Sequence, residues 1–116
     1  MTLFTDNVTA GIESALNSVS LRQRVTADNM ANMNTPGFKA SRVEFENTLA
    51  SAMANGDASQ AQAKVVMANE PAGADGNTVN MADEQSILVK SELHFDALVE
   101  ALNYKFNTLR TAIKGS

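Results

Sequence analysis

The chain has 116 residues, the length of one ordinary domain, with 44% apolar residues, 5% aromatic residues and a net charge of −4. The negative charge without a basic run argues against nucleic acid as a partner, and no apolar stretch approaches the ~20 residues of a membrane-spanning helix. Cysteine is absent, which excludes disulfides and thiolate metal sites, and the one histidine, His94, argues against a histidine-based metal site or a His-dependent triad. We expect no metal site, no cofactor and no enzymatic activity.

The first predicted element is a helix over residues 4–34. Its apolar residues follow helical spacing through Ile12, Leu16 and Val19, and Thr5 or Asp6 is the candidate N-cap. Two apolar residues further along leave this stripe, namely Leu21 and Val25. We therefore expect this helix to contact more than one neighbour. No basic segment followed by an apolar segment precedes the helix, so a cleaved secretory signal is not expected.

The run from Asn29 to Lys39, Asn-Met-Ala-Asn-Met-Asn-Thr-Pro-Gly-Phe-Lys, ends the helix with a turn. Pro36 cannot continue a helix and biases Thr35 away from helical dihedral angles. A Pro-Gly pair suits the central positions of a type II turn, so Pro36 and Gly37 are expected there. Phe38 can then fold back onto an apolar surface.

Residues 35–79 form a less regular middle. Residues 42–54 carry Phe45, Leu49 and Met53 four positions apart, which predicts a short helix. Residues 64–67 predict one short strand, and the proline and glycines of residues 70–78 predict turns. Around the short helix, the middle is expected to be flexible or weakly β.

Residues 80–114 carry the most regular pattern and predict a long amphipathic helix. One apolar row recurs every seven residues and a second row lies four positions along, as in a coiled coil. The rows are Met81, Leu88, Phe95, Leu102 and Leu109, then Val99, Phe106 and Ile113, with Leu98 broadening the stripe. Asn80 is the expected N-cap, Asp83 and Glu84 are charges of the first turn, and Arg110 and Lys114 lie in the last turn.

These elements predict an all-α fold in a single domain of residues 1–116. The two long terminal helices should pack antiparallel in a coiled-coil-like layer, joined by the short central helix and the irregular middle. We expect the seam to use Ile12, Leu16, Val19, Leu88, Phe95, Leu98, Val99, Leu102, Phe106 and Leu109. One partner helix covers only one side of so wide a stripe, so both helices should need partners outside the chain, most simply other subunits.

As a sequence pattern, the helix-ending run resembles the Asn-x-Ala-Asn-x-x-Thr-Pro-Gly-(Phe/Tyr) signature near the N-terminus of bacterial flagellar axial proteins, which form the rod and hook. The matching residues are Asn29, Ala31, Asn32, Thr35, Pro36, Gly37 and Phe38. Residues 39–46, 75–81 and 98–115 are similar to the corresponding segments of the proximal rod proteins of the basal body. Residues 51–74 carry no specific match and are too short for the added outer domain of hook and distal rod proteins.

The resemblance implies a structural subunit that assembles with itself and with other rod proteins into the drive shaft, which transmits torque from the rotor to the hook. It implies the rod adaptor protein FliE and the flagellar export gate as further partners. It also implies export by the flagellar type III apparatus without a cleaved signal peptide, and a place in the basal-body rod on the periplasmic side.

Two other functions fit the same amphipathic ends. A secreted helical interaction protein or export chaperone would bind one partner and stay soluble. A membrane-surface binder would use the last helix, but the polar face of that helix carries both signs of charge. Its charged residues are Lys90, Glu92, Asp96, Glu100 and Lys105. Anionic lipid should attract this face little, and direct membrane insertion is not expected.

Overall fold

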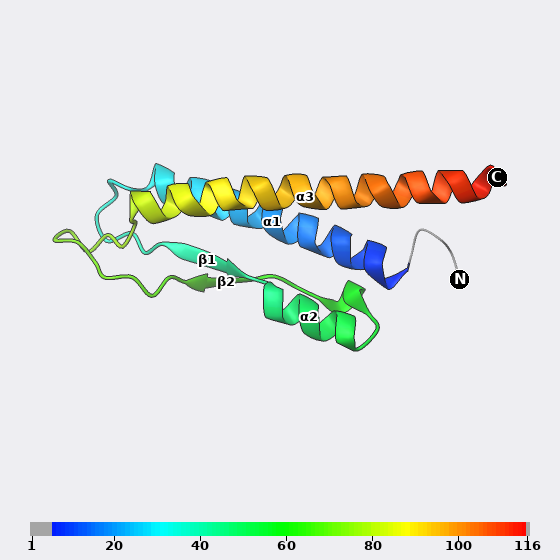
Figure 1. Ribbon diagram of the computed structural model, residues 1–116. Coiled ribbons are helices and arrows are strands. Elements are labelled where there is room, and N and C mark those ends of the chain that lie inside the picture. The colour runs from blue at the N-terminus through cyan, green and yellow to red at the C-terminus, as the bar shows by residue number, and fades with distance from the viewer. Residues whose placement is uncertain (1–5, 116) are drawn as a thin grey trace.

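The computed structural model describes residues 6–115 and is dominated by two long antiparallel helices that lie side by side (Figure 1). The elements in chain order are α1 Asn7–Ala31, β1 Ser41–Glu44, α2 Glu46–Ala54, the 3₁₀ turn η1 Ala58–Gln60, β2 Lys64–Met67 and α3 Met81–Ile113. The two strands and α2 lie together on one side of the helix pair. The predicted fold class is confirmed. The two long terminal helices are in contact, and the chain between them forms a short central helix and a small hairpin.

The caps set where the long helices begin. The Asp6 side chain accepts a hydrogen bond from the Thr9 N–H at 2.6 Å, and α1 starts at the next residue. Asn80 accepts from the N–H groups of Ala82 and Asp83, which confirms it as the N-cap of α3. The predicted start of α1 at residues 4 and 5, with Thr5 as a cap, lies outside the described residues. The predicted end at residue 34 was wrong, because α1 ends at Ala31 and a turn follows.

The middle of the chain holds a two-stranded antiparallel hairpin. Ser41 pairs with Met67 and Glu44 with Lys64, so β2 confirms the strand predicted at residues 64–67. Residues 42–45, predicted as the start of the central helix, were placed wrongly, since α2 begins only at Glu46. Residues 42–44 instead pair with β2 in the strand, whereas the first turn of a helix would leave its N–H groups free, and Phe45 directly precedes α2.

The hydrophobic core is small and is shared between the long helices and the middle. Its fully buried members are Ala15, Val19, Val43 and Phe45. Partly buried apolar side chains pack against them, namely Leu21, Val25, Leu49, Ala63, Phe95 and Leu98. Because α1 contacts α3, β1, α2 and η1, the expectation that this helix has more than one neighbour is confirmed.

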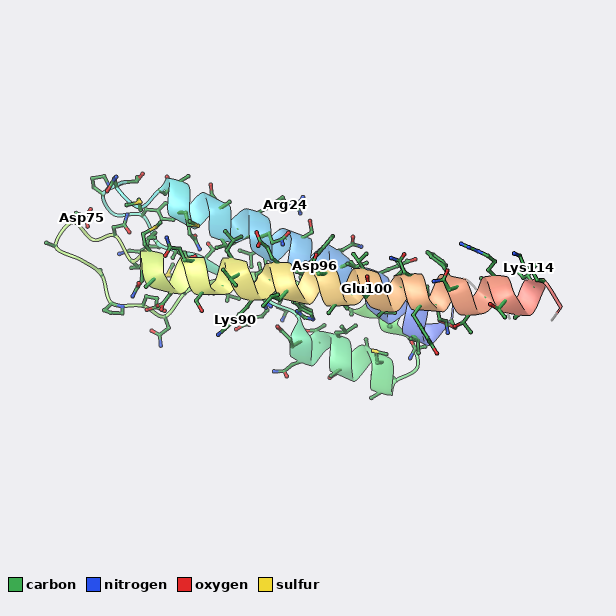
Figure 2. All side chains as sticks on the ribbon, turned by 45° about the horizontal axis from the view of Figure 1, so that its top comes forward. Arg24, Asp75, Lys90, Asp96, Glu100 and Lys114 are labelled. Carbon is green, nitrogen blue, oxygen red and sulfur yellow. The ribbon has the colours of Figure 1, made fainter. Side chains whose placement is uncertain are left out.

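The molecule is strongly elongated. Its principal extents are 65 × 25 × 14 Å, and its radius of gyration of 17.8 Å exceeds the ~13 Å of a compact chain of this length. Asp75 lies at one end of the long axis and Lys114 at the other (Figure 2). Among the described residues, no helix has the length and apolar character that crossing a membrane requires.

Candidate functional site

The residues of the signature form a tight turn directly after α1. The Phe38 N–H donates to the Thr35 carbonyl at 3.2 Å, and Gly37 has a positive φ of 76°. With Pro36 ahead of that glycine, this is the geometry of the predicted type II turn. Phe38 is half-buried, whereas Pro36 is exposed. The turn therefore reverses the chain and sends it toward β1.

A second segment, residues 75–78, is bonded along this turn just before α3 begins. The Gly37 N–H donates to the Asp75 carbonyl at 2.9 Å, and the Thr78 N–H donates to the Phe38 carbonyl at 3.0 Å. Two further hydrogen bonds complete the pairing: Ala40 N–H donates to Thr78 Oγ1, and Lys39 Nζ donates to the Gly76 carbonyl. We call residues 32–40 together with residues 75–78 the clasp. It joins the end of α1 to the start of α3.

Asn77 is the central side chain of the clasp. It is buried, and its Nδ2 donates to the carbonyl of Asn32 at 2.9 Å and to the carbonyl of Thr35 at 2.7 Å. Its Oδ1 accepts from the Val79 N–H at 2.7 Å. One amide thus bonds backbone groups on both sides of the clasp. An apolar side chain would leave the Val79 N–H without this partner and would remove one of the two donors to each of the Asn32 and Thr35 carbonyls.

A buried polar network lies beside the clasp and links α1, β1 and α3. Asn29 is 1% exposed, and its amide bonds both backbone groups of Ser41, with the N–H donating to Oδ1 at 3.0 Å and the carbonyl accepting from Nδ2 at 2.9 Å. The same Nδ2 donates to Glu84 Oε1 at 2.8 Å, and Arg42 lies 2.9 Å from Glu84 Oε2. Glu84 is fully buried. It lies in the first turn of α3, as predicted, but its burial was not predicted: it fills the junction between the three elements.

The structure brings most of the predicted signature residues together. Asn29, Asn32, Thr35, Gly37 and Phe38 all bond partners in the clasp or the buried network. Ala31 and Pro36 are exposed and make no such bond among the described residues. The sequence analysis missed their partners, which are Ser41, Arg42, Asn77, Thr78 and Glu84. Residues 75–81 resemble the segment that opens the C-terminal helix of rod proteins, but this resemblance predicts no contact with the turn after α1.

The ten residues predicted for the seam are buried to very different extents. Val19 is fully buried, and Phe95 and Leu98 pack against the core that contains it. The others are half-buried or exposed, and Phe106 reaches 40% exposure. The half-buried ones are Ile12, Leu16, Leu88, Val99, Leu102 and Leu109. The chain by itself therefore leaves much of the predicted seam in contact with solvent.

The fully buried positions of α3 are polar. They are Glu84 and Ser91, seven residues apart, and none of the apolar heptad residues is as well covered. On α1 the buried set consists of small or polar residues besides Val19, namely Thr9, Gly11, Ala15, Ser18, Thr26 and Asn29. Within one chain, the apolar rows of α3 flank the best-covered positions and do not coincide with them.

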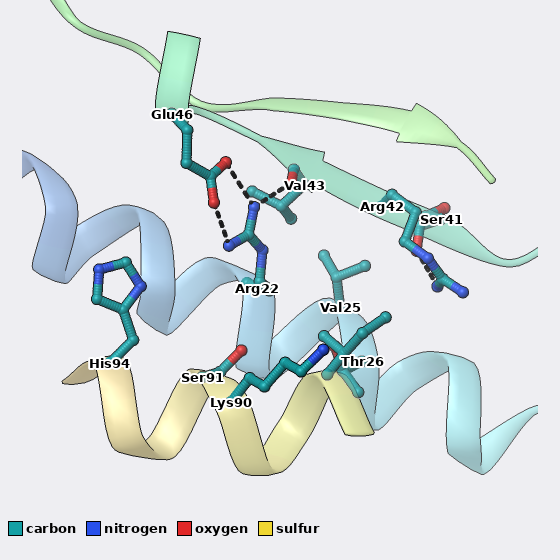
Figure 3. Close-up of a pocket in the computed structure, with 11 residues that line it drawn as sticks. Arg22, Val25, Thr26, Ser41, Arg42, Val43, Glu46, Lys90, Ser91 and His94 are labelled. Atoms are coloured by element: carbon teal, nitrogen blue, oxygen red, sulfur yellow. Dashed lines mark hydrogen bonds and ion pairs between the residues drawn. The ribbon is translucent and has the colours of Figure 1, made fainter. Parts of the chain in front are cut away.

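A groove of about 380 Å³ between α1, β1 and α3 contains the main exposed ion pair (Figure 3). The Arg22 guanidinium donates to both carboxylate oxygens of Glu46, at 2.8 and 2.9 Å, and to the Val43 carbonyl. Its Cζ lies 4.7 Å from the centre of the Phe45 ring. The hydrogen bond from Arg22 lowers the pKa of Glu46 to about 2.

His94 stacks on Phe45, with 6.2 Å between the two ring centres, in keeping with a residue on a helix flank. No group of side chains suited to a metal ion occurs in the described part of the chain.

The contact between the long helices ends at a second ion pair. Lys105 of α3 lies 2.6 Å from Asp6, the cap of α1. The hydrogen bond from Lys105 and those from Thr9 lower the pKa of Asp6 to about 2. From Lys105 to its last residue, Ile113, α3 continues for about 12 Å at 1.5 Å per residue. The helix pair therefore has one end where α3 projects past the start of α1.

The chain is similar in sequence to several known proteins. Residues 12–39 match the family model described as "Flagella basal body rod protein". The chain is 34% identical to the flagellar basal body rod protein FlgB of Cereibacter sphaeroides, over 81% of this chain and 84% of that protein. It is 30% identical to the same-named protein of Aeromonas hydrophila over 87% and 88% of the two chains, and 29% identical to that of Bacillus subtilis over 99% and 98%.

Proposed function

Since the chain belongs to the FlgB family of flagellar basal body rod proteins, a family of structural, non-enzymatic proteins, we propose that it is a subunit of the proximal rod. There it assembles with its own copies and with other rod proteins into the shaft that carries torque from the rotor to the hook. The adaptor protein FliE and the flagellar export gate are its further partners. It is exported by the flagellar type III apparatus and works on the periplasmic side.

The observation that carries this proposal is the incomplete cover of the apolar rows of α3. Leu102 and Leu109 are only half-buried, and Ile113 is 68% exposed. Apolar surface gains roughly 25 cal/mol for each Å² removed from water, so a long uncovered row favours association. An elongated monomer with such a row is suited to helical assembly, in which neighbours cover what the single chain does not.

The clasp supplies the alignment that such an assembly needs. It holds the end of α1 against the start of α3 through backbone bonds and the buried amide of Asn77, and the neighbouring network adds the buried amide of Asn29. Buried and satisfied polar groups favour one register over others, since a shifted register would leave them unpaired. The signature residues thus act on assembly indirectly, by setting how the two apolar helices present themselves together.

Substitutions in the apolar row test the assignment. Phe95→Asp and Leu102→Asp should abolish rod formation and swimming while expression is kept, because a carboxylate cannot be buried in an apolar contact without a large cost. Phe95 also packs against the core of its own chain, so Leu102→Asp is the cleaner variant. Asn103→Asp, at the neighbouring exposed position, is the matched control and should leave both readouts unchanged.

Rod formation is measured by electron microscopy of isolated basal bodies, and motility by spreading in soft agar. Normal swimming of the Leu102→Asp strain would contradict the assigned surface. A soluble complex with a single closed partner, and no chain in the rod, would instead favour the export-chaperone function.

A further inference from the structure

Charge is distributed unevenly along the long axis. Beyond Glu100, every charged residue of α3 and its cap is basic, namely Lys105, Arg110 and Lys114. At the opposite end, where α1 stops and α3 starts, the acidic residues are Asp28, Glu70, Asp75 and Asp83. They outnumber the one lysine there, Lys39. The buried Glu84 is left out of this comparison together with Arg42, with which it pairs. Figure 2 places Asp75 and Lys114 at the two extremes of the long axis. The projecting end of α3 is therefore basic, and the region around residues 70–83 is mainly acidic.

The basic end carries an amphipathic surface that we call the tail patch. Helical spacing puts its members on neighbouring positions of one face, and they are Phe106, Leu109, Arg110, Ile113 and Lys114. The patch lies on the part of α3 that projects past the Asp6–Lys105 pair. Arg110 and Lys114 form no ion pair with the described residues. Apolar and cationic side chains are thus exposed together.

The acidic end carries a hollow that we call the head groove. Its volume is about 430 Å³, and its lining includes Met33, Glu70, Asp75 and Met81. Met33 is 44% exposed and Asp75 is exposed, while the Glu70 carboxylate lies 3.9 Å from Arg42. The groove adjoins the clasp, since Asn77 and Thr78 also line it. It presents carboxylates beside thioether side chains, which adapt readily to the shape of a partner.

We propose that the tail patch of one copy docks in the head groove of a second copy, so that Arg110 and Lys114 face Asp75 and Glu70 and Ile113 contacts Met33. Opposite charges at the two ends make this pairing attractive, while head-to-head and tail-to-tail contacts bring like charges together. A head-to-tail contact uses two different surfaces, so it repeats from copy to copy and gives an open helical array when its rotation does not close into a ring. The inference rests on the proposed rod function and names the contact that joins successive copies.

Cross-linking between two single-cysteine variants tests the contact, because the natural chain has no cysteine. Ala74→Cys marks the head groove and Ala112→Cys marks the tail; both residues are exposed. The two variants are produced together in flagellated cells, and a short thiol-specific cross-linker is applied to isolated basal bodies. The two sites lie at opposite ends of a 65 Å molecule, so a product that joins them connects two copies. We expect a mixed dimer, and no dimer when either variant is present alone.

Charge variants identify the cause. Arg110→Glu with Lys114→Glu should lower the yield of mixed dimer about tenfold, as expected when two exposed attractive pairs become repulsive. Glu70→Lys with Asp75→Lys in the other copy should restore it. Lys90→Glu is the matched control, because it reverses an exposed charge in the middle of α3 and should leave the yield unchanged. Circular dichroism of each purified variant checks that the helices are retained.

Some outcomes overturn the docking alone. Tail-to-tail product from Ala112→Cys, a yield indifferent to charge reversal, or cross-linking of the tail only to a different rod protein would each do so. Rods that form normally without mixed dimer would also reject the contact and leave the rod function standing. Absence of the chain from the isolated rods would instead reject the proposed function itself.

Discussion

Single side chains of the clasp and its neighbouring network each make several hydrogen bonds. Asn29 holds both backbone groups of Ser41 and one oxygen of Glu84 with a single amide. Without that amide, the part-buried N–H of Ser41 would lose its partner, and the Ser41 carbonyl would keep only the bond from Arg42. The contribution of Asn29 to stability is therefore larger than that of an average hydrogen-bonded residue.

The substitution Asn29→Ala should lower the free energy of unfolding by about 2–4 kcal/mol, since it leaves several buried polar groups unsatisfied. Urea denaturation followed by circular dichroism measures this. Asn34→Ala, at an exposed position of the following turn, is the control and should change stability by less than about 0.5 kcal/mol. Equal effects of the two substitutions would show that the buried network contributes little.

The Arg22–Glu46 pair should make stability depend on pH in the acidic range. The pKa of Glu46 is lowered from its ordinary 4.5 to about 2 in the folded chain, so folding favours the charged carboxylate. The stabilisation is fully present above pH 4.5 and is lost as the pH falls toward 2. The side chain of Glu46 is 58% exposed, so solvent screening limits the contribution to about 1 kcal/mol or less.

Glu46→Gln should therefore lower the melting temperature at pH 7, and its difference from the natural chain should vanish as the pH approaches 2. Thermal melts across that range provide the measurement. A difference between the two chains that stays constant with pH would contradict the assigned ion pair.

Sequence analysis identified the turn residues and the caps because their roles are local. Pro36 and Gly37 have the dihedral preferences of a type II turn, and Asp6 and Asn80 are good caps in any context. The roles of Glu84 and Asn77 could not be predicted in the same way. Their partners lie more than 40 residues away along the chain, and nothing in the local pattern marks an acidic residue of a first turn as buried.

Among the elements, α3 was predicted almost to the residue and β1 was missed. The heptad rows and the Asn80 cap define α3 without tertiary information. Residues 41–44 are few, and the spacing of Phe45, Leu49 and Met53 extended the predicted helix over them. Their strand conformation depends on pairing with residues 64–67, which a local pattern does not reveal.

The first turn of α1 should depend on Asp6 in two separable ways. Asp6→Asn keeps a side-chain oxygen for the Thr9 N–H but loses the charge that pairs with Lys105, whereas Asp6→Ala loses both. We expect hydrogen exchange at the amides of Thr9 and Ala10 to be faster in the alanine variant than in the asparagine variant. Exchange at Val19 serves as the control and should stay slow in both. Identical exchange at Thr9 in the natural chain and the alanine variant would disprove the capping role.

At the scale of the whole molecule, the elongated shape arises because only a small part of the chain packs back onto the two long helices. The middle covers one side of the helix pair only, and α3 runs past the start of α1 (Figure 1). The need for partners was inferred from the width of the apolar stripe, and the half-buried rows agree with that inference. The sequence did not indicate which side of the stripe the chain covers itself, because this depends on the buried pairing of Asn29 with Glu84.

Small-angle scattering of the dilute monomer should give a radius of gyration near 17.8 Å, well above the ~13 Å of a compact chain of 116 residues. The value should rise with concentration as copies associate through the uncovered rows. A compact value that does not change on concentration would mean that the isolated chain already covers its apolar surface.

The clasp also has a consequence for how the chain can vary in length. The residues between Phe38 and Asp75 begin and end at one closed junction and pack along one side of the helix pair, and the β1–β2 ladder closes a smaller ring inside the first. Gly56 lies at the tip of this excursion, in the turn between α2 and η1, and has open space around it. Extra residues spliced in at that tip would enlarge the excursion while the alignment of the two long helices stayed fixed, so the outer bulk of such a subunit is uncoupled from its inner framework.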